Sequence, residues 1–308
     1  MQISILEYPA GRAGQSIIDA YVEQVAELRA EGFTRMWSVQ MPFERDLLTA
    51  MAVAFREVGD IELGTGVLPI QNQHPMLLAQ RALTLNVIAG GRLVLGLGMT
   101  HQAVTEGMWG IPWDKPIRRL GEYLDGLLPL LNGEQADAAG ETVTTRGALQ
   151  IPGSSAPPVY IAALGPQMLK LAGRRTAGTV TWMTGPKTLA GHIGPTLRDA
   201  AVAAGRAADS VHVVAALPIA VTDDVDGLRK VAAAQFAMYG HLPSYRAMLD
   251  REGYAGPQDA AMIGDESEVS ARLAELRDAG VDEFAAGTFD PSPEGRARTR
   301  ALLRSLAG

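Results

Sequence analysis

The chain has 308 residues, of which 47% are hydrophobic and 20% charged, and its formal net charge is −7. This composition is typical of a globular protein, and the acidic balance argues against a nucleic-acid partner, because phosphate binding needs a basic face. The absence of cysteine excludes disulfides, thiolate metal ligands and cysteine nucleophiles.

Strand and helix signals alternate from the first residues onward. The apolar runs and their turn residues predict strands at 2–7, 35–40, 61–67, 92–99, 157–164, 179–185, 210–222 and 284–289. Periodic segments predict helices at 16–32, 47–59, 76–90, 117–133, 165–178, 187–205, 266–280 and 292–306. We expect Asp46 to cap the second helix, a small hairpin at 142–153, and an ordered loop at 100–116.

This alternation predicts an α/β protein built from parallel βα units. Eight units in this length suit a closed (β/α)8 TIM barrel better than an open doubly wound sheet. Residues 223–257 read as helical with a break at 240–244, and they exceed one crossover helix. We therefore expect a single domain over 1–308, with an insertion at about 223–257 on the C-terminal face of the barrel.

The third strand, IELGTGVLP at 61–69, carries Gly64 and Gly66 and is ended by Pro69. Glycine inside a strand marks a bulge or a close approach of backbone or ligand. A strand with glycines at its C-terminal end that leads into a helix is a candidate ligand site.

In a barrel, the active site lies at the C-terminal ends of the strands. The residues that end the predicted strands are mostly glycine, apolar or aromatic, which suits a broad apolar ligand. Glu7 and the segments 66–69, 182–186 and 287–288 fall there. From these ends we take as candidate site residues Gln40, Gly66, Val67, Gly98, Met99, Thr100, His101, Leu164, Gly165, Pro166, Gln167, Met168, Trp182 and Thr184. The scattered histidines have no metal-ligand spacing, so we expect no metal site.

Two glycine-containing segments could bind a dinucleotide or a phosphate, and each also has a purely structural interpretation. The segment Gly96–Gly98 contains GxG, but it ends a strand instead of opening the GxGxxG turn of a dinucleotide site. The segment Leu164–Met168 leads from a strand into a helix, where free backbone amides can hold a phosphate. The alternative is that Gly165 and Pro166 only make a tight turn.

His101 is the candidate proton donor, because imidazole exchanges protons near neutral pH. The alternative is a solvated loop histidine. We expect His74 to cap or pack against the helix that follows it. Trp182, with Trp109 and Trp113 in the loop at 100–116, could stack on a ring system or pack in the core.

Several segments resemble the bacterial luciferase-like superfamily. They are HPMLLAQRALTLNVIAGG, GRLVLGLGM, GTGV, AALGPQMLKLAG and TAGTVTWMTGP, and the likeness extends to YGHLPSYRAMLDREG and MIGDESEV. Within the superfamily the chain is most similar to the actinobacterial branch that uses the deazaflavin coenzyme F420.

The resemblance implies a TIM barrel whose C-terminal mouth holds a redox cofactor. It also implies a cis peptide at Gly66–Val67 that backs the deazaflavin ring, and a cofactor phosphate near Gly165–Met168. Lys170 would assist with the acidic tail of the coenzyme. Many relatives have an Asp-His pair where this chain has Val39 and Gln40, and a glutamate where it has His101.

We therefore expect a cytoplasmic, F420-dependent oxidoreductase that transfers a hydride to or from a small, largely apolar organic substrate. His101 would supply the proton, and Gln40 would orient the substrate or bind the carbonyl edge of the cofactor. Two alternatives remain open, an FMN-dependent monooxygenase of the same superfamily and a cofactor-binding protein without turnover. The family also implies a homodimer, and the alanine- and methionine-rich helix at 47–58 could form its interface or could equally pack on its own barrel. We expect no membrane partner.

Overall fold

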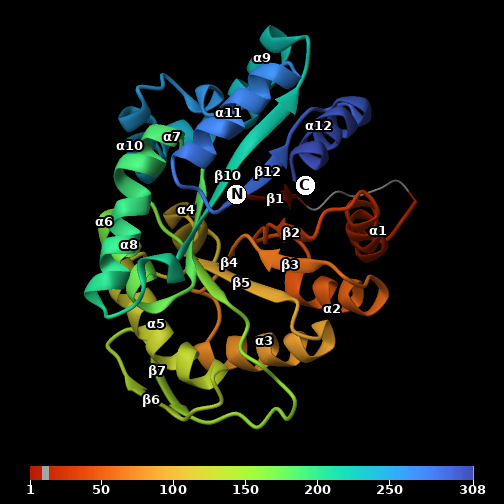
Figure 1. Ribbon diagram of the computed structural model, residues 1–308. Coiled ribbons are helices and arrows are strands. Elements are labelled where there is room, and N and C mark those ends of the chain that lie inside the picture. The colour runs from red at the N-terminus through yellow and green to blue at the C-terminus, as the bar shows by residue number, and fades with distance from the viewer. Residues whose placement is uncertain (9–13, 308) are drawn as a thin grey trace. The chain divides into compact units, whose positions relative to one another are not determined.

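The computed structural model describes residues 1–8 and 14–307. It contains the eight predicted parallel strands, each followed by helical structure, in the chain order of a (β/α)8 protein (Figure 1). The chain divides into two compact units, which are described separately. Unit 1 comprises Met1–Glu7, Glu31–Trp37 and Ala163–Gly308, and unit 2 comprises Tyr8–Ala30 and Ser38–Ala162. The expected single domain stays a prediction.

The strands of unit 1 pair in parallel around the long strand β10. They are β1 (Gln2–Glu7), β9 (Gly178–Trp182), β10 (His212–Val221), β11 (Met262–Gly264) and β12 (Glu283–Thr288). Strand β12 lies between β1 and β10. The first half of β10 pairs with β9 and its last three residues pair with β11. The short strand β11 was absent from the sequence prediction, because three residues carry no periodic signal.

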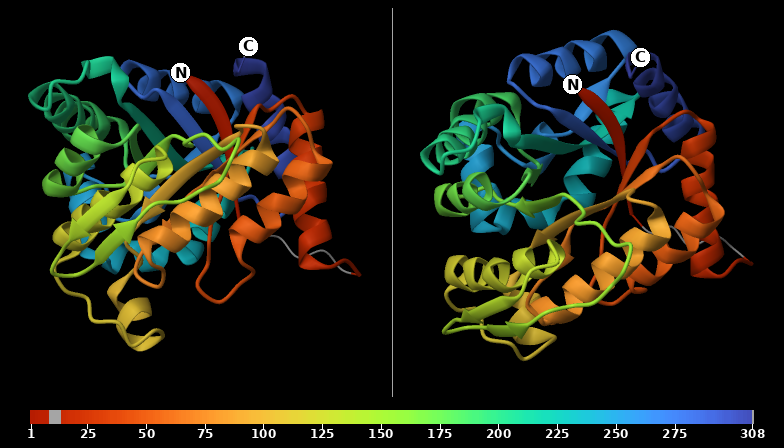
Figure 2. Two further views of the ribbon diagram at one scale, coloured as in Figure 1. Left: turned by 90° about the horizontal axis from the view of Figure 1, so that it is seen from below. Right: turned by 60° about the horizontal axis from the view of Figure 1, so that its bottom comes forward.

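The helices of unit 1 follow its strands. They are α6 (Pro166–Arg175), α7 (Pro186–Thr188), α8 (Gly194–Ala203), α9 (Val225–Gln235), α10 (Pro243–Glu252), α11 (Glu266–Asp278) and α12 (Pro293–Leu306). Helices α11 and α12 both pack on β10 (Figure 2). The predicted helix at 187–205 is confirmed as a continuous helical run over 186–203, in which a π-helical segment, Leu189–Ile193, lies between α7 and α8. The predicted break at 240–244 is confirmed by a 3₁₀ segment, Ala237–His241, before α10.

The strands of unit 2 are β3 (Glu62–Thr65), β4 (Leu68–Pro69), β5 (Leu93–Gly98) and β8 (Val159–Ala162). Strand β5 lies between β3 and β8 and also pairs with β4. All six residues of β5 are buried, as its continuous apolar run predicted. Strand β2 (Arg35–Ser38) has its first three residues in unit 1 and Ser38 in unit 2.

The helices of unit 2 are α1 (Ile17–Ala30), α2 (Leu47–Glu57), α3 (Pro75–Ala89), α4 (Gln102–Gly107) and α5 (Pro116–Leu131). The Asp46 carboxylate accepts the Thr49 amide at 2.9 Å and caps α2, as predicted. His74 caps α3, since its Nδ1 accepts the Met76 amide at 3.1 Å.

Two local predictions for unit 2 are corrected. The loop at 100–116 contains helix α4, which a loop reading missed. The hairpin lies earlier than 142–153, with β6 at Ala136–Ala139 and β7 at Thr144–Gly147 beside α5 (Figure 1). Its position is set by α5, because the Glu122 carboxylate accepts the backbone amides of Glu141 at 3.1 Å and Thr142 at 2.6 Å.

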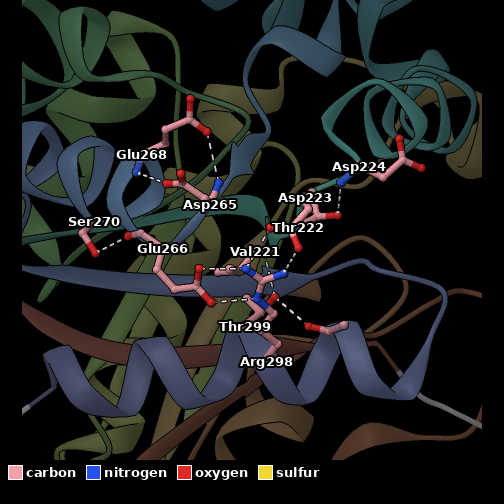
Figure 3. A network of polar contacts seen from close by, with 11 residues as sticks. Val221, Thr222, Asp223, Asp224, Asp265, Glu266, Glu268, Ser270, Arg298 and Thr299 are labelled. Carbon is pink, nitrogen blue, oxygen red and sulfur yellow. Dashed lines mark hydrogen bonds and ion pairs between the residues drawn. The ribbon is translucent and has the colours of Figure 1, made fainter.

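Polar contacts join the last elements of unit 1 (Figure 3). The Arg298 guanidinium of α12 contacts Glu266 at 2.7 Å and Asp223 at 3.1 Å. The neighbouring Thr299 hydroxyl is buried and accepts the Val221 amide of β10 at 2.9 Å. Helix α12 is therefore fixed to β10 by one exposed ionic group and one buried hydrogen bond.

In the described part of the chain, no helix has both the length and the apolar character needed to cross a bilayer. The same residues contain no cluster of three or more histidine, aspartate or glutamate side chains that could hold a metal ion.

Candidate active site

Unit 2 has a bulge at the C-terminal end of β3. Gly64 pairs with Val94, and the next pair is Leu68 with Leu97, so three residues on one strand oppose two on β5. The Thr65 hydroxyl spans this interruption, because it donates to the Gly96 carbonyl at 2.7 Å and accepts the Gly96 amide at 2.9 Å. The bulge confirms that the glycines of this strand mark an irregularity.

The Gly66–Val67 peptide within the bulge is cis, as the family resemblance implied. The Val67 side chain lies against two glycines of β5. A Cβ on Gly98 would be 2.6 Å from Val67 Cγ2, and one on Gly96 would be 2.0 Å from the Thr65 carbonyl oxygen. Gly96 and Gly98 are therefore required by packing, and they do not form a dinucleotide fingerprint.

The residues after β5 continue from this bulge. Thr100 donates its amide to Gln71 Oε1 at 3.4 Å, which is a long contact. The Nε2 of Gln71 is buried and has no hydrogen-bond partner among the described residues. Buried donors are nearly always paired, so this amide is a ligand-contact candidate that the sequence did not single out.

His101 occupies the N-cap position of α4, but its side chain makes no capping hydrogen bond. Its carbonyl accepts the amides of Val104 at 2.9 Å and Thr105 at 3.1 Å. The imidazole is half-buried, and burial lowers the pKa of His101 below its ordinary value. The neutral form is therefore favoured at neutral pH.

The Gln40 side chain holds the loop between β2 and α2. Its Nε2 donates to the carbonyls of Met41 at 2.7 Å and Arg45 at 3.0 Å, and its Oε1 accepts the Leu47 amide at 2.7 Å. Both amide hydrogens are used in these contacts. The catalytic role of Gln40 stays a prediction, and the geometry favours a structural one.

In unit 1, the turn between β8 and α6 has the form expected of an anion-binding helix start. Gly165 is an extended N-cap with no side-chain capping bond, and Pro166 takes the first helical position. Residues 165–167 are exposed, and Met168 is half-buried. His192 Nε2 contacts the Leu164 carbonyl at 2.9 Å and so fixes the residue that precedes the turn.

The end of β9 brings Trp182 and Thr184 together. The Thr184 hydroxyl donates to the Trp182 carbonyl at 3.2 Å, and Met183 between them is buried with φ 56°. The indole Nε1 of Trp182 is buried and has no hydrogen-bond partner among residues 1–8 and 14–307. Gly287 on β12 makes room for the ring, because a Cβ there would be 3.2 Å from it.

The insertion contributes aromatic rings beside Trp182. The ring centroids of Phe236 and Tyr239 lie 5.9 and 6.1 Å from that of Trp182, both edge to face. Phe236 also contacts Phe289, at 5.6 Å. These rings of 223–257 were not predicted as site residues, because their spacing in sequence does not show which strand end they reach.

Glu7 ends β1 in unit 1. Burial, opposed by the charges of Arg300 and Arg296, raises the pKa of Glu7 from 4.5 to about 7. It is therefore a group that changes charge near neutral pH, and Thr288 and two arginines of α12 act on it.

The sequence of this chain is similar to those of known proteins. Residues 2–288 match the family model described as luciferase-like monooxygenase. The 5,10-methylenetetrahydromethanopterin reductase of Methanolobus tindarius is 27% identical over 92% of this chain and 92% of its own length. The enzyme of that name from Archaeoglobus fulgidus is 31% identical over 72% of this chain and 66% of its own length.

Solved structures show the fold. The coenzyme F420-dependent tetrahydromethanopterin reductase of Methanopyrus kandleri has a TM-score of 0.82 at 21% identity, over 98% of this chain and 97% of that one. The oxygenating constituent of 3,6-diketocamphane monooxygenase from Pseudomonas putida, in complex with FMN, has a TM-score of 0.77 at 16% identity, over 99% and 97%. The predicted (β/α)8 TIM-barrel fold is thereby confirmed.

Proposed function

The chain belongs to the luciferase-like monooxygenase family, and from this premise we propose that it is an F420-dependent oxidoreductase. In this proposal it transfers a hydride between the deazaflavin and a small organic substrate. Support for F420 comes from the reductases named above, one of which is described as dependent on this coenzyme.

The observation that carries the proposal is the apolar wall of unit 2, where Val67 lies against Gly96 and Gly98. A planar tricyclic ring needs a flat apolar surface, which the half-buried Val67 side chain packed on these glycines would provide. The buried Gln71 Nε2 lacks a partner in the described chain and would donate to a carbonyl on the ring edge. The remaining residues that we propose to lie near the ring adjoin Val67 or follow the end of β5 in sequence, and they are Gly66, Gly98, Met99 and Thr100.

In unit 1, the turn Leu164–Met168 would receive the phosphate of the coenzyme. The N-terminal amides of α6 have no side-chain cap, and the helix dipole favours an anion there. Trp182 would present its ring edge and its unpartnered Nε1, and Thr184 would hold the backbone beside it. Lys170 is exposed one turn further along α6 and would approach the acidic tail.

A bound deazaflavin supplies the hydride chemistry, while the protein positions it and excludes competing reactions. His101 would exchange the accompanying proton with the substrate through its imidazole. Its lowered pKa means that it is mainly a proton acceptor at pH 7, which favours the oxidation of a substrate C–H bond. Reduction would then be favoured at lower pH.

Titration of the purified protein with F420 and, separately, with FMN tests the cofactor. We expect F420 to bind and its absorbance at the deazaflavin band to change when a substrate is added. The second candidate, an FMN-dependent monooxygenase, is favoured by the likeness to the FMN-bound 3,6-diketocamphane enzyme. Binding of FMN without binding of F420 would reject our proposal, and binding without any turnover would favour a non-catalytic role.

We also propose that the protein works as a homodimer in the cytoplasm. The apolar residues Leu47, Leu48, Met51, Ala54 and Phe55 of α2 are buried within the chain, so a dimer would have to use the other face of this helix. Size-exclusion chromatography with light scattering would test the dimer, since a mass near 32.6 kDa would exclude it.

A further inference from the structure

Arg45 lies in the loop between β2 and α2 of unit 2, and its side chain is half-buried. Its Nε and Nη2 are each buried and have no hydrogen-bond acceptor among the described residues. The guanidinium carbon lies 4.6 Å from the centroid of the Tyr21 ring. Arginine stays charged in proteins, so Arg45 carries a half-buried charge, and two of its three nitrogens lack an acceptor.

The ring of Tyr21 attracts the charge but does not satisfy the donors. A cation over a ring is attracted to its face, whereas N–H groups need an acceptor oxygen in the guanidinium plane. The Tyr21 hydroxyl is itself paired, because it lies 3.0 Å from Ser38 Oγ. The hydrogen bonds that Nε and Nη2 of Arg45 can donate are therefore not satisfied by Tyr21.

The acidic groups close to Arg45 in sequence are committed elsewhere or exposed. Asp46 accepts two hydrogen bonds from Thr49 and pairs with Arg81. Glu44 is exposed and acts on Arg45 only as a distant charge in the same loop. Burial lowers the pKa of the Arg45 guanidinium, which shows that these charges do not compensate for its removal from water.

The backbone that carries Arg45 is held in place from both sides. Gln40 accepts the Leu47 amide and donates to the Arg45 carbonyl at 3.0 Å. Ser38, which contacts Tyr21, also accepts the Gly66 amide of the bulge at 2.8 Å. The Arg45 loop and the proposed ring wall are therefore linked within unit 2 through Tyr21, whose ring contacts the Arg45 guanidinium and whose hydroxyl contacts Ser38.

Phe43, two residues before Arg45, is 67% exposed, although large aromatic side chains are usually buried. An exposed ring in the same loop as this guanidinium suits a ligand that has an anionic end and an apolar body. The forked donors of arginine match the two oxygens of a carboxylate.

We infer that Arg45 anchors an anion site in unit 2, which takes a carboxylate attached to an apolar body. That carboxylate belongs either to the substrate or to the acidic tail of the coenzyme. Only this choice of source rests on the proposed function, because the site is argued from the contacts of Arg45 alone.

Calorimetric titration of the full-length protein with benzoate, with the neutral isostere benzamide as control, tests the site. We expect benzoate to bind more tightly than benzamide, and the substitution Arg45→Gln to weaken benzoate binding about tenfold or more. Arg45→Lys keeps the charge but lacks the forked donors, so its affinity for benzoate should lie between those of the unsubstituted protein and Arg45→Gln. Arg56→Gln removes an exposed arginine of α2 and should leave benzoate binding unchanged.

The two sources are separated by titration with F420 and with the deazaflavin that lacks phosphate and tail. If the carboxylate is that of the tail, Arg45→Gln weakens F420 binding and leaves binding of the tailless compound unchanged. If neither benzoate nor F420 binding differs between Arg45→Gln and Arg56→Gln, the inference is overturned. If the unsubstituted protein does not bind F420 while its benzoate binding still depends on Arg45, the proposed function is rejected and the anion site is kept.

Discussion

The indole Nε1 of Trp37 donates to Glu283 Oε1 across 2.6 Å, within unit 1. The same oxygen accepts the Ser4 hydroxyl at 2.6 Å, and the second carboxylate oxygen pairs with Arg35. Glu283 is only 4% exposed. One buried carboxylate thus joins the first residues of β12 to β1 and β2.

Removal of the Glu283 carboxylate should strongly destabilise the protein. Glu283→Ala leaves Arg35 and Trp37 without their buried partner, so we expect a loss of about 3 to 5 kcal/mol in the free energy of unfolding. Glu283→Gln keeps an acceptor for Trp37 and should lose less. Urea denaturation followed by circular dichroism measures both, and equal losses would contradict a contribution from the acceptor oxygen that glutamine retains.

The contact between Val67 and Gly98 predicts a coupled pair of substitutions. Gly98→Ala places a Cβ 2.6 Å from Val67 Cγ2, and such overpacking should lower stability by about 1 to 3 kcal/mol. Val67→Ala removes the methyl group that the new Cβ meets. The double variant should therefore be more stable than additivity of the single effects predicts, and strict additivity would contradict the contact.

His101→Gln should lower turnover and leave F420 affinity nearly unchanged, because the residue is proposed to move a proton and not to hold the ring. Burial lowers the pKa of His101, so in the oxidative direction activity should fall as the pH drops below the ordinary histidine value. The variant should lose this acid limb. A pH profile of the same shape in both proteins would refute the role of His101.

Glu7 should make the stability of the protein depend on pH. Its pKa rises from 4.5 to about 7 on folding, mainly through burial, so the folded state holds the proton more tightly. The stabilisation is complete below pH 4.5 and is lost as the pH rises to about 7. Glu7→Gln should raise the melting temperature at pH 8, by an amount corresponding to roughly 2 to 3 kcal/mol, and have little effect at pH 4. The exposed Glu57→Gln should show no such pH dependence.

The neighbours Arg298 and Thr299 should differ in their contributions to stability (Figure 3). Thr299→Val removes the acceptor of the Val221 amide, and a buried unpaired amide costs about 1 to 3 kcal/mol. Arg298 and its partners are solvent-accessible, so Arg298→Ala should have a smaller effect, which disappears in 1 M salt. Thermal unfolding at low and high salt compares them; a larger loss for Arg298→Ala would contradict this ranking.

The sequence predicted the features that depend on local chemistry. Asp46 and His74 were read correctly as helix starts, because a side-chain oxygen or nitrogen caps the amides nearest to it in sequence. It also predicted the eight parallel strands, since their apolar runs are long. The position of the hairpin depends instead on Glu122, which lies about twenty residues away on another element.

The residues of the candidate site were predicted only where local sequence features single them out. Glycines 66 and 98 stand out in their strands, so the irregularity at this point could be predicted from the sequence. Gln71 and Arg45 lie in polar loop segments that look ordinary in the sequence. Only the folded structure shows that their side-chain donors are buried without a partner. Gln40 was chosen for its place at a strand end, but its hydrogen bonds to the following loop were invisible in the sequence.

Positions 67 and 98 are thirty-one residues apart in the chain and occupy one shared volume. A relative that carries a side chain at the position of Gly98 should therefore carry a smaller residue than valine at the position of Val67. The two positions should therefore vary together among relatives, and a side chain at position 98 should be accepted only after the loss of bulk at position 67.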